Sequence, residues 1–356
     1  MTTRKKYDQA SFLKVGENLY RNESSETYYG IVKRSGKQIK RSLKTKDFAL
    51  AKRYLKELEN KVDRIDPMKG KVKIPFKDLA KRWLKIQKPN LKESSYTRKQ
   101  TSINALNKHF GNLNVRSITK RHCENWAVKR APERSASTFN NEKETLNSIL
   151  GYAIKEGITI DNPAQYLKRR KVGKKELIIP SKEQFKVLLK KLRSMDIRYH
   201  HAANLIELLA HSGMRKGEAN SFKWRDVDYS RAQFIVTGGE IGTKNHDVRI
   251  VPLFPALKRF FKRLEGDRIL DDPEDLVVPI LSAKNALMTA CKLLEFPNFT
   301  HHSLRHYFVS NAIEKGVDFK TIAAWVGHKD GGILVAQTYG HLRDTHSKEM
   351  AKLMTE

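Results

Sequence analysis

The chain has 356 residues, enough for two or three domains that each bury a core of their own. Its 70 Lys and Arg residues against 39 Asp and Glu residues leave a formal net charge of +31, which indicates a polyanionic partner. Nucleic acid is the expected partner, and a membrane surface is the competing one. No apolar run is long enough to span a bilayer and the N-terminal MTTRKKYDQA lacks a signal-peptide core, so we expect no membrane partner. Cys123 and Cys291 form no CxxC pair, so we expect neither a disulfide nor a zinc site, and a reducing, cytoplasmic setting.

Residues 1–65 are predicted to form a small α+β domain. Residues 27–34 are rich in β-branched and aromatic side chains, residues 35–37 are turn-like and residues 38–43 alternate, which predicts a hairpin. A helix is expected from about Phe48, with Asp47 as its N-cap. The hairpin carries the basic residues Lys33, Arg34, Lys37, Lys40 and Arg41. They could bind DNA phosphates or form a solvated edge that resists aggregation, and the net charge of the chain favours DNA.

Residues 75–170 are predicted to form a helical domain after a basic linker. Apolar spacing predicts helices at 76–86, 95–110, 119–129 and 137–156. Polar and basic residues near two helix starts are candidate phosphate contacts, because free backbone N–H groups there already favour anions: Thr97, Arg98, Lys99, Thr138, Asn141 and Lys143. An ordinary charged surface is the alternative. The stretch KRRKVGKK at 168–175 is interpreted as a linker that crosses phosphates between two domains.

Residues 177–356 are predicted to form a third, mixed domain. Helices are expected from Ser181 to about 192 and at 202–211, followed by a short helix that carries Arg215 and Glu218. Strands are expected at 233–236 and 248–251, with Lys244 in their hairpin, and helices at 257–264 and 284–294. The fold class is therefore mainly α with small β elements (α+β).

The segment 300–341 has the composition of a phosphate site. It holds His302, Arg305, His328 and Tyr339, and its three acids, Glu314, Asp318 and Asp330, are not adjacent to one another. Two-metal phosphodiester chemistry needs clustered carboxylates. Metal-free attack needs cationic donors and a side-chain nucleophile, which this segment supplies. We therefore expect phosphodiester chemistry without a metal or another cofactor.

Four motifs, in order along the chain, resemble those of the tyrosine recombinase (phage integrase) family. HSGMRKGE resembles the first arginine box, with Arg215 and the acidic Glu218, and TKNHDVRIVPL resembles the hairpin lysine motif, with Lys244 eight residues before Pro252 and Arg249 in register. THHSLRHYF resembles the HxxR box, with His302 and Arg305. WVGHKDGGILVAQTYGHL resembles the final box, with His328 and Tyr339. The middle domain resembles the family's SAM-like core-binding domain, and the first resembles its arm-binding domains.

The resemblance implies a site-specific DNA recombinase, the integrase of a mobile element, that cuts and rejoins duplex DNA through a 3′-phosphotyrosine on Tyr339. By this resemblance Arg215 and Arg305 hold the phosphate, Lys244 protonates the leaving 5′ oxygen, His328 hydrogen-bonds the phosphate and Glu218 orients its neighbours. His302 is the candidate base. A homotetramer on core-type and arm-type sites, helped by bending or directionality proteins at the nucleoid, is also implied.

The sequence departs from the family pattern at two places, and three other functions are alternatives to the predicted one. Tyr339 follows His328 by 11 positions, a longer interval than usual that contains Gly331 and Gly332, and Ser303 stands where an acid is common. Tyr307 is expected to be a packing residue.

A Xer-like chromosome or plasmid resolvase would use the same chemistry, but the basic hairpin argues against it. A type IB topoisomerase is not indicated, and a non-catalytic helix-turn-helix regulator would not depend on Tyr339.

Overall fold

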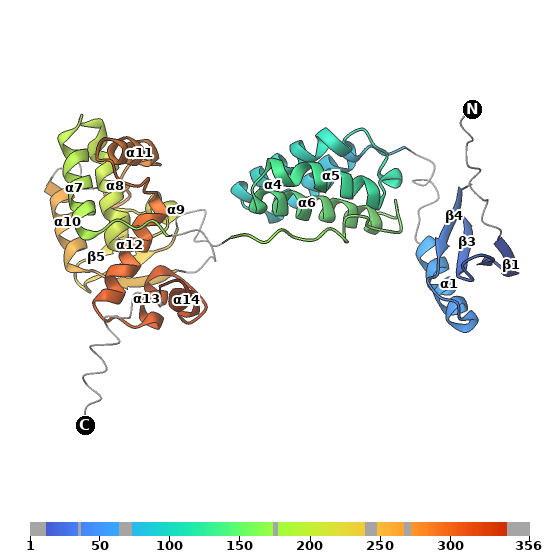
Figure 1. Ribbon diagram of the computed structural model, residues 1–356. Helices are drawn as coiled ribbons and strands as arrows, with labels where there is room; N and C mark the ends of the chain where they lie inside the picture. Colours follow the sequence, from blue (N-terminus) through green and yellow to red (C-terminus); the bar gives the residue numbers. More distant parts are fainter. Residues whose placement is uncertain are drawn as a thin grey trace, which may run out of the picture. The chain divides into compact units, whose positions relative to one another are not determined.

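The structure, a computed structural model, describes residues 12–34, 37–63, 73–173, 177–238, 248–266 and 272–339. The chain divides into two units, Met1–Lys174 and Lys175–Glu356. Figure 1 shows the chain coloured along the sequence. The first unit contains two hydrophobic clusters that share no residue, one within residues 19–62 and one within residues 74–164. The division into three domains at 1–65, 75–170 and 177–356 stays a prediction.

An antiparallel sheet with the strand order β1-β2-β3-β4 begins the described chain. The strands are β1 (Phe12–Gly16), β2 (Leu19–Asn22), β3 (Tyr28–Arg34) and β4 (Lys37–Ser42), and α1 (Phe48–Asp63) packs against them. The predicted hairpin is β3–β4, in which Val32 lies opposite Ile39. Asp47 caps α1 by accepting a 2.7 Å hydrogen bond from the Leu50 amide. The sheet was only half predicted, because β1 and β2 are short and carry polar residues.

Among the described residues of the first unit, four helices follow α1, as predicted. They are α3 (Phe76–Gln87), α4 (Glu93–Phe110), α5 (Lys120–Glu133) and α6 (Ala136–Lys155), with short 3-10 turns at Lys88–Asn90 and Val115–Ser117. Large buried side chains such as Phe76, Phe110 and Trp126 fill the space between them. Thr119 and Ser135 cap the starts of α5 and α6 through their hydroxyl groups, which explains where these helices begin.

The second unit is built around α8, which packs against α7, α10 and α12. Its elements are α7 (Lys182–Ser194), α8 (Arg198–Ser212), α9 (Lys216–Ala219), a 3-10 turn (Trp224–Asp226), β5 (Val227–Asp228), β6 (Gln233–Val236), β7 (Arg249–Pro252), α10 (Pro255–Gly266), α11 (Lys284–Leu293), α12 (His301–Glu314), α13 (Phe319–Val326) and α14 (Ile333–Tyr339). The three strands form a small antiparallel sheet. Tyr307 lies in the core, with its ring centroid 4.8 Å from that of Phe185, so the expectation that it packs agrees with the structure.

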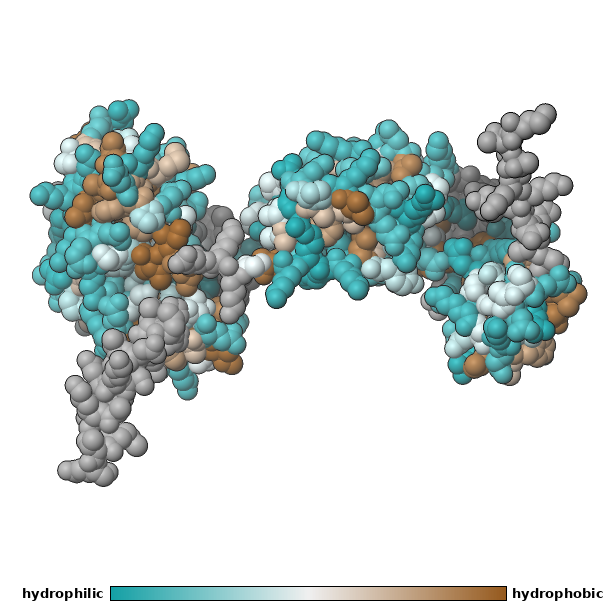
Figure 2. Space-filling model, viewed as in Figure 1, coloured by the Kyte–Doolittle hydropathy of each residue, from teal (hydrophilic) through white to brown (hydrophobic). Residues whose placement is uncertain are grey.

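The surfaces of both units are dominated by polar side chains. Figure 2 shows hydrophilic residues over most of the face in view, with smaller apolar patches between them. Within the described part of the chain, no helix combines the length and the apolar character needed to cross a membrane. The mainly α fold with small β elements is confirmed.

Candidate active site

Arg305 comes from the second turn of α12, whose start is fixed by a reciprocal cap. The Ser303 amide donates to the Thr300 hydroxyl and the Thr300 amide donates to the Ser303 hydroxyl, both at 3.2 Å. Ser303 therefore replaces the acid common at this position without loss of the capping interaction. With the helix start fixed, His302, Arg305 and His306 are three and four residues apart and share one face of α12.

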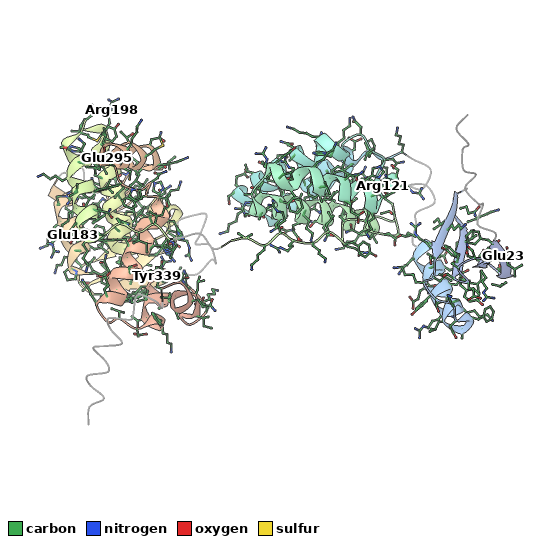
Figure 3. All side chains as sticks on the ribbon, viewed as in Figure 1. Glu23, Arg121, Glu183, Arg198, Glu295 and Tyr339 are labelled. Carbon is green, nitrogen blue, oxygen red and sulfur yellow. The ribbon has the colours of Figure 1, made fainter. Side chains whose placement is uncertain are left out.

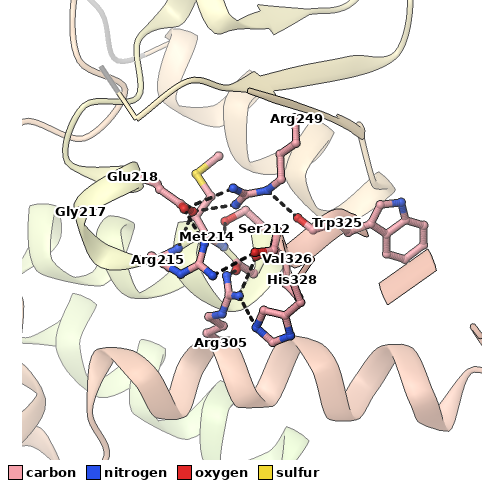
Figure 4. Close-up of polar contacts among 12 residues, drawn as sticks. Ser212, Met214, Arg215, Gly217, Glu218, Arg249, Arg305, Trp325, Val326 and His328 are labelled. Carbon is pink, nitrogen blue, oxygen red and sulfur yellow. Dashed lines mark hydrogen bonds and ion pairs between the residues drawn. The ribbon is translucent and has the colours of Figure 1, made fainter. Parts of the chain in front are cut away.

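The Arg305 guanidinium is held by main-chain carbonyls (Figure 4). Nη1 donates to the Gly213 oxygen and Nη2 donates to the Val326 oxygen, each at 2.6 Å. These carbonyls lie at the C-terminal ends of α8 and α13, where the last carbonyls of a helix lack partners within the helix and favour a cation. Gly213 has a φ of 66°, and a Cβ there would lie 2.4 Å from the Phe308 ring, so only glycine fits.

Glu218, which is buried, joins two partly buried arginines in one cluster (Figure 4). Its carboxylate accepts from Arg215 Nη1 at 2.9 Å and from Arg249 Nη2 at 2.6 Å. Arg249 Nε also donates to the Trp325 oxygen at 2.8 Å, and Arg215 Nη2 donates to the Gly327 oxygen at 3.1 Å. Burial alone would raise the pKa of Glu218, but the hydrogen bonds and charges of Arg249 and Arg215 outweigh it and lower the pKa to about 2. Glu218 is therefore ionised.

Positive charge exceeds negative charge in this cluster. Arg215, Arg249 and Arg305 carry three charges, and among the described residues Glu218 supplies the carboxylate that pairs with two of them. Burial and the charge of Arg215 lower the pKa of Arg305 to about 9, so its guanidinium stays charged at neutral pH. The cluster therefore favours binding of an anion.

A cavity of about 450 Å³ opens at this cluster. Five of the predicted residues line it: Arg215, His302, Arg305, His328 and Tyr339. They come from the start of α9, from α12, from the loop after α13 and from α14. Glu218 contacts Arg215 and does not line the cavity itself. Lys244 lies outside the described residues, between β6 and β7.

His328 contacts Arg305 through one ring nitrogen. Arg305 Nη2 donates to His328 Nε2 at 3.1 Å, which places the proton of a neutral imidazole on Nδ1. Burial first, and then the charges of Arg305 and Arg215, lower the pKa of His328 to about 4, so the ring is neutral at pH 7. Nδ1 is buried and has no hydrogen-bond partner among the described residues. Its N–H is thus free to donate to a ligand in the cavity.

Tyr339 is the last residue of α14 and is only 4% exposed. Gly331 and Gly332 form the turn before this helix, with φ values of 63° and 100°. Asp330 Oδ1 and Oδ2 accept from the amides of Gly332 and Leu334 at 3.1 and 3.0 Å. This turn accommodates the long interval after His328. Figure 3 labels Tyr339 among the side chains of the second unit.

His306 lies against the Tyr339 hydroxyl, and the sequence analysis missed it. The two residues hydrogen-bond through His306 Nδ1, and their ring centroids are 5.5 Å apart. The available signal was its spacing, directly after Arg305 and four residues after His302 on a helix. Burial and the charges of His302, Arg305 and His328 lower the pKa of His306 to about 4.

The predicted DNA contacts all belong to the first unit. Lys33, Lys40 and Arg41 are exposed on β3 and β4, and Arg34 and Lys37 end and begin these strands. Thr97 and Arg98 are exposed near the start of α4, where Lys99 is half-buried with its ammonium 5.0 Å from the Trp83 ring centroid. Thr138 and Asn141 are exposed near the start of α6, and Lys143 is half-buried. Their role in binding DNA stays a prediction.

Two family descriptions match the chain in the order of its predicted domains. Residues 75–131 match "Phage integrase, N-terminal SAM-like domain" and residues 181–346 match "Phage integrase family". The chain belongs to the phage integrase family. This integrase is therefore a site-specific tyrosine recombinase of the phage or mobile-element kind, an enzyme that binds and recombines DNA. The predicted family, function and enzyme class are confirmed.

Known integrases match most of this integrase's length. It is 23% identical over 344 residues to the prophage ps2 probable integrase of Lactococcus lactis subsp. lactis (strain IL1403), covering 85% of this chain and 87% of the relative. It is also 23% identical to the ICEBs1 integrase of Bacillus subtilis (strain 168), covering 87% and 91%. A lambda integrase dimer bound to a COC′ core site has the same fold, with a TM-score of 0.63, 17% identity and coverage of 92% and 95%.

Proposed function

We propose that this integrase cuts DNA by attack of the Tyr339 hydroxyl oxygen on a phosphodiester that Arg215 and Arg305 hold. The product is a 3′-phosphotyrosine, which keeps the phosphodiester's energy for rejoining to a second 5′-hydroxyl. One observation carries the proposal: the cavity lined by Tyr339 also receives two guanidinium groups from a cluster with excess positive charge.

The two arginines supply what a metal ion supplies in other phosphodiester enzymes. Charge grows on the non-bridging oxygens in the pentacoordinate transition state, and a planar guanidinium can donate two hydrogen bonds to them. Arg305 is preorganised by the Gly213 and Val326 carbonyls, and Arg215 by Glu218. Groups held in place before the reaction stabilise developing charge without reorganisation. The free Nδ1–H of His328 gives the phosphate a further donor.

The leaving 5′ oxygen needs a proton, and Lys244 is the proposed acid. In the sequence Lys244 lies between β6 and β7, and Arg249 at the start of β7 donates hydrogen bonds to Glu218 and to the Trp325 carbonyl. These bonds fix the start of β7 beside the arginine cluster. Lys244 precedes this anchored arginine by five positions in the sequence, which supports its proposed role.

We also propose that four copies assemble on two DNA sites. The structures similar to this chain include a lambda integrase tetramer bound to a Holliday junction, at a TM-score of 0.61 and 16% identity, which supports such an assembly. The helical domain would contact core-type sites and the N-terminal sheet arm-type sites, with accessory bending or directionality proteins as partners. A recombinase of this kind works on DNA in the cytoplasm, at the nucleoid.

A covalent trapping experiment tests the nucleophile. A nicked duplex that carries the attachment site is incubated with the integrase in EDTA, and the protein–DNA adduct is resolved by denaturing electrophoresis. Tyr339→Phe abolishes the adduct because it removes the attacking oxygen. Tyr307→Phe, which removes the same atom from a core tyrosine on α12, still forms it. An adduct on another residue, or strict dependence on magnesium, contradicts the proposal.

A further inference from the structure

The Tyr339 hydroxyl has one hydrogen-bond partner among the described residues, and it is His306 Nδ1. From the sequence, His302 was the candidate base instead. His302 lies one turn earlier on α12, and its ring meets the edge of the His306 ring with centroids 4.4 Å apart. His306 therefore stands between His302 and the phenol that must lose a proton.

The surroundings of His306 keep its imidazole neutral. Most of the ionisable groups lining the cavity with it are basic: Arg215, His302, Arg305, His328 and Lys329, with Asp330 as the acid and Tyr339 as the phenol. Partial burial and the basic neighbours hold its pKa near 4. A neutral ring that accepts through Nδ1 carries its proton on Nε2, so the phenol donates the hydrogen bond. The lone pair on Nδ1 already points at the proton to be removed.

We propose that His306 is the general base that takes the Tyr339 proton during cleavage and returns it during rejoining. The proposal rests on Tyr339 being the nucleophile. As the phenol oxygen bonds to phosphorus, its proton passes to Nδ1 and the bond from phosphorus to the 5′ oxygen breaks, with that oxygen protonated by the separate acid. In rejoining, a 5′-hydroxyl attacks phosphorus, its proton goes to the conjugate base of that acid, and the leaving phenolate recovers the proton from the His306 imidazolium.

Charge makes this transfer feasible. A neutral base with a low pKa accepts a proton poorly in the unliganded protein. The scissile phosphate brings negative charge into the cavity, and more develops in the transition state, so the imidazolium forms where an anion stabilises it. His306 thus gains basicity only when DNA occupies the cavity.

Two substitutions separate proton transfer from positioning. His306→Asn keeps an acceptor oxygen near the place of Nδ1 but cannot take a proton, and His306→Ala removes both functions. Both are expected to slow adduct formation on saturating nicked DNA at pH 7 by about 10²- to 10⁴-fold, the usual contribution of a general base. DNA affinity stays unchanged. His302→Asn is the matched control one turn away on the same helix.

Two measurements of the adduct-formation rate distinguish proton transfer from a purely structural role: its dependence on pH and its response to a more acidic nucleophile. Between pH 6 and 8 the wild-type rate is nearly flat because the free base is already neutral. The His306 variants depend on hydroxide, so their rates rise about tenfold per pH unit below the phenol pKa of about 10. Replacing Tyr339 with a fluorotyrosine, whose phenol is more acidic, accelerates the His306→Asn variant much more than the wild type.

Several results overturn the proposal, and they differ from failure of the proposed function. Adduct formation by His306→Asn at the wild-type rate reduces His306 to a positioning residue. A slow variant with a flat pH profile and no response to fluorotyrosine shows a structural defect. A rising profile in His302→Asn returns the role of base to His302. If the wild type forms no adduct at Tyr339, the nucleophile assignment itself is wrong, and the base proposal falls with it.

Discussion

Glu218 is the residue on which the arrangement of the arginine cluster depends. Its side chain is 3% exposed, and its two oxygens receive hydrogen bonds from Arg215 and Arg249. A buried carboxylate is stable only while its partners remain, because removing one leaves charge that water no longer solvates. Arg249 therefore contributes to the site without lining the cavity.

Arg249→Met tests this dependence. We expect the variant to lose about 2 to 4 kcal/mol of unfolding free energy, because the buried Glu218 keeps Arg215 as its one ionic partner among the described residues. Hydrogen exchange of the α8 and α12 amides, followed by mass spectrometry in the full chain, measures the loss. Arg231→Met is the control, since its pair with Asp228 is 3.9 Å long and its side chain is 78% exposed, and it should cost less than about 1 kcal/mol.

The same pair of variants gives a dependence on pH. The pKa of Glu218 is lowered from 4.5 to about 2, so its contribution is complete above about pH 4.5 and is lost as the pH falls towards 2. The stability difference between wild type and Arg249→Met should therefore shrink from pH 7 to pH 3. A difference that stays constant or grows on acidification would show that packing, rather than the ion pair, accounts for it.

The turn between α13 and α14 determines where the nucleophile lies. Gly331 and Gly332 both have positive φ, and a Cβ on Gly332 would lie 2.8 Å from the Phe319 carbonyl. Backbone cannot move aside as a flexible side chain can. The start of α14, and with it Tyr339, is therefore located by a close contact between this turn and the start of α13.

Two glycine substitutions separate close contact from backbone strain. Gly332→Ala should slow adduct formation about 100-fold, because displacement of a reacting group by about 1 Å has an effect of that order. Gly331→Ala adds only the cost of a left-handed alanine, about 1 to 2 kcal/mol, since nothing lies within 4 Å of its Cβ. The rate of single-turnover adduct formation is measured for both variants, with DNA affinity as the control. Equal effects would contradict a role for the Phe319 contact.

The elements that could be predicted are those whose signals are local. Helices such as α4 and α6 follow from apolar spacing and from caps such as Ser135, so their ends were predicted within a few residues. β1 and β2 were missed because strands of five and four residues depend on partners elsewhere in the sheet. The cavity residues followed from family motifs. The contact between His306 and Tyr339 could not be predicted from the sequence, because it depends on how α14 packs against α12.

At the scale of the whole molecule, the net charge of +31 governs how the integrase meets DNA. A protein that neutralises phosphates releases counterions, so its affinity falls steeply with salt. The charge is not itself a map of contacts, because exposed lysines and arginines occur over both units. An individual phosphate contact is identified by how much its removal lowers the slope of log affinity against log salt.

Arg98→Ala should lower the slope of log affinity against log salt by about 1, because one phosphate contact is lost. Arg198→Ala removes the same charge from the second unit, where Asp196 holds the guanidinium at 2.9 Å, and should leave the slope unchanged. Fluorescence anisotropy with a labelled duplex over a range of salt concentrations measures both slopes. Equal slopes for the wild type and Arg98→Ala would remove Arg98 from the predicted contacts.

Main-chain anchoring of Arg305 has a consequence for how this enzyme can change over time. The acceptors at Gly213 and Val326 are carbonyl oxygens, which every amino acid possesses. Mutations around them can alter side-chain chemistry while the two helix ends go on supplying the same atoms in the same place. Substitution at Val326 therefore leaves the support of Arg305 in place, whereas Gly213 must remain glycine because of its contact with Phe308. Directed evolution of new target sites can vary the residues around these two positions without removing the support of this arginine.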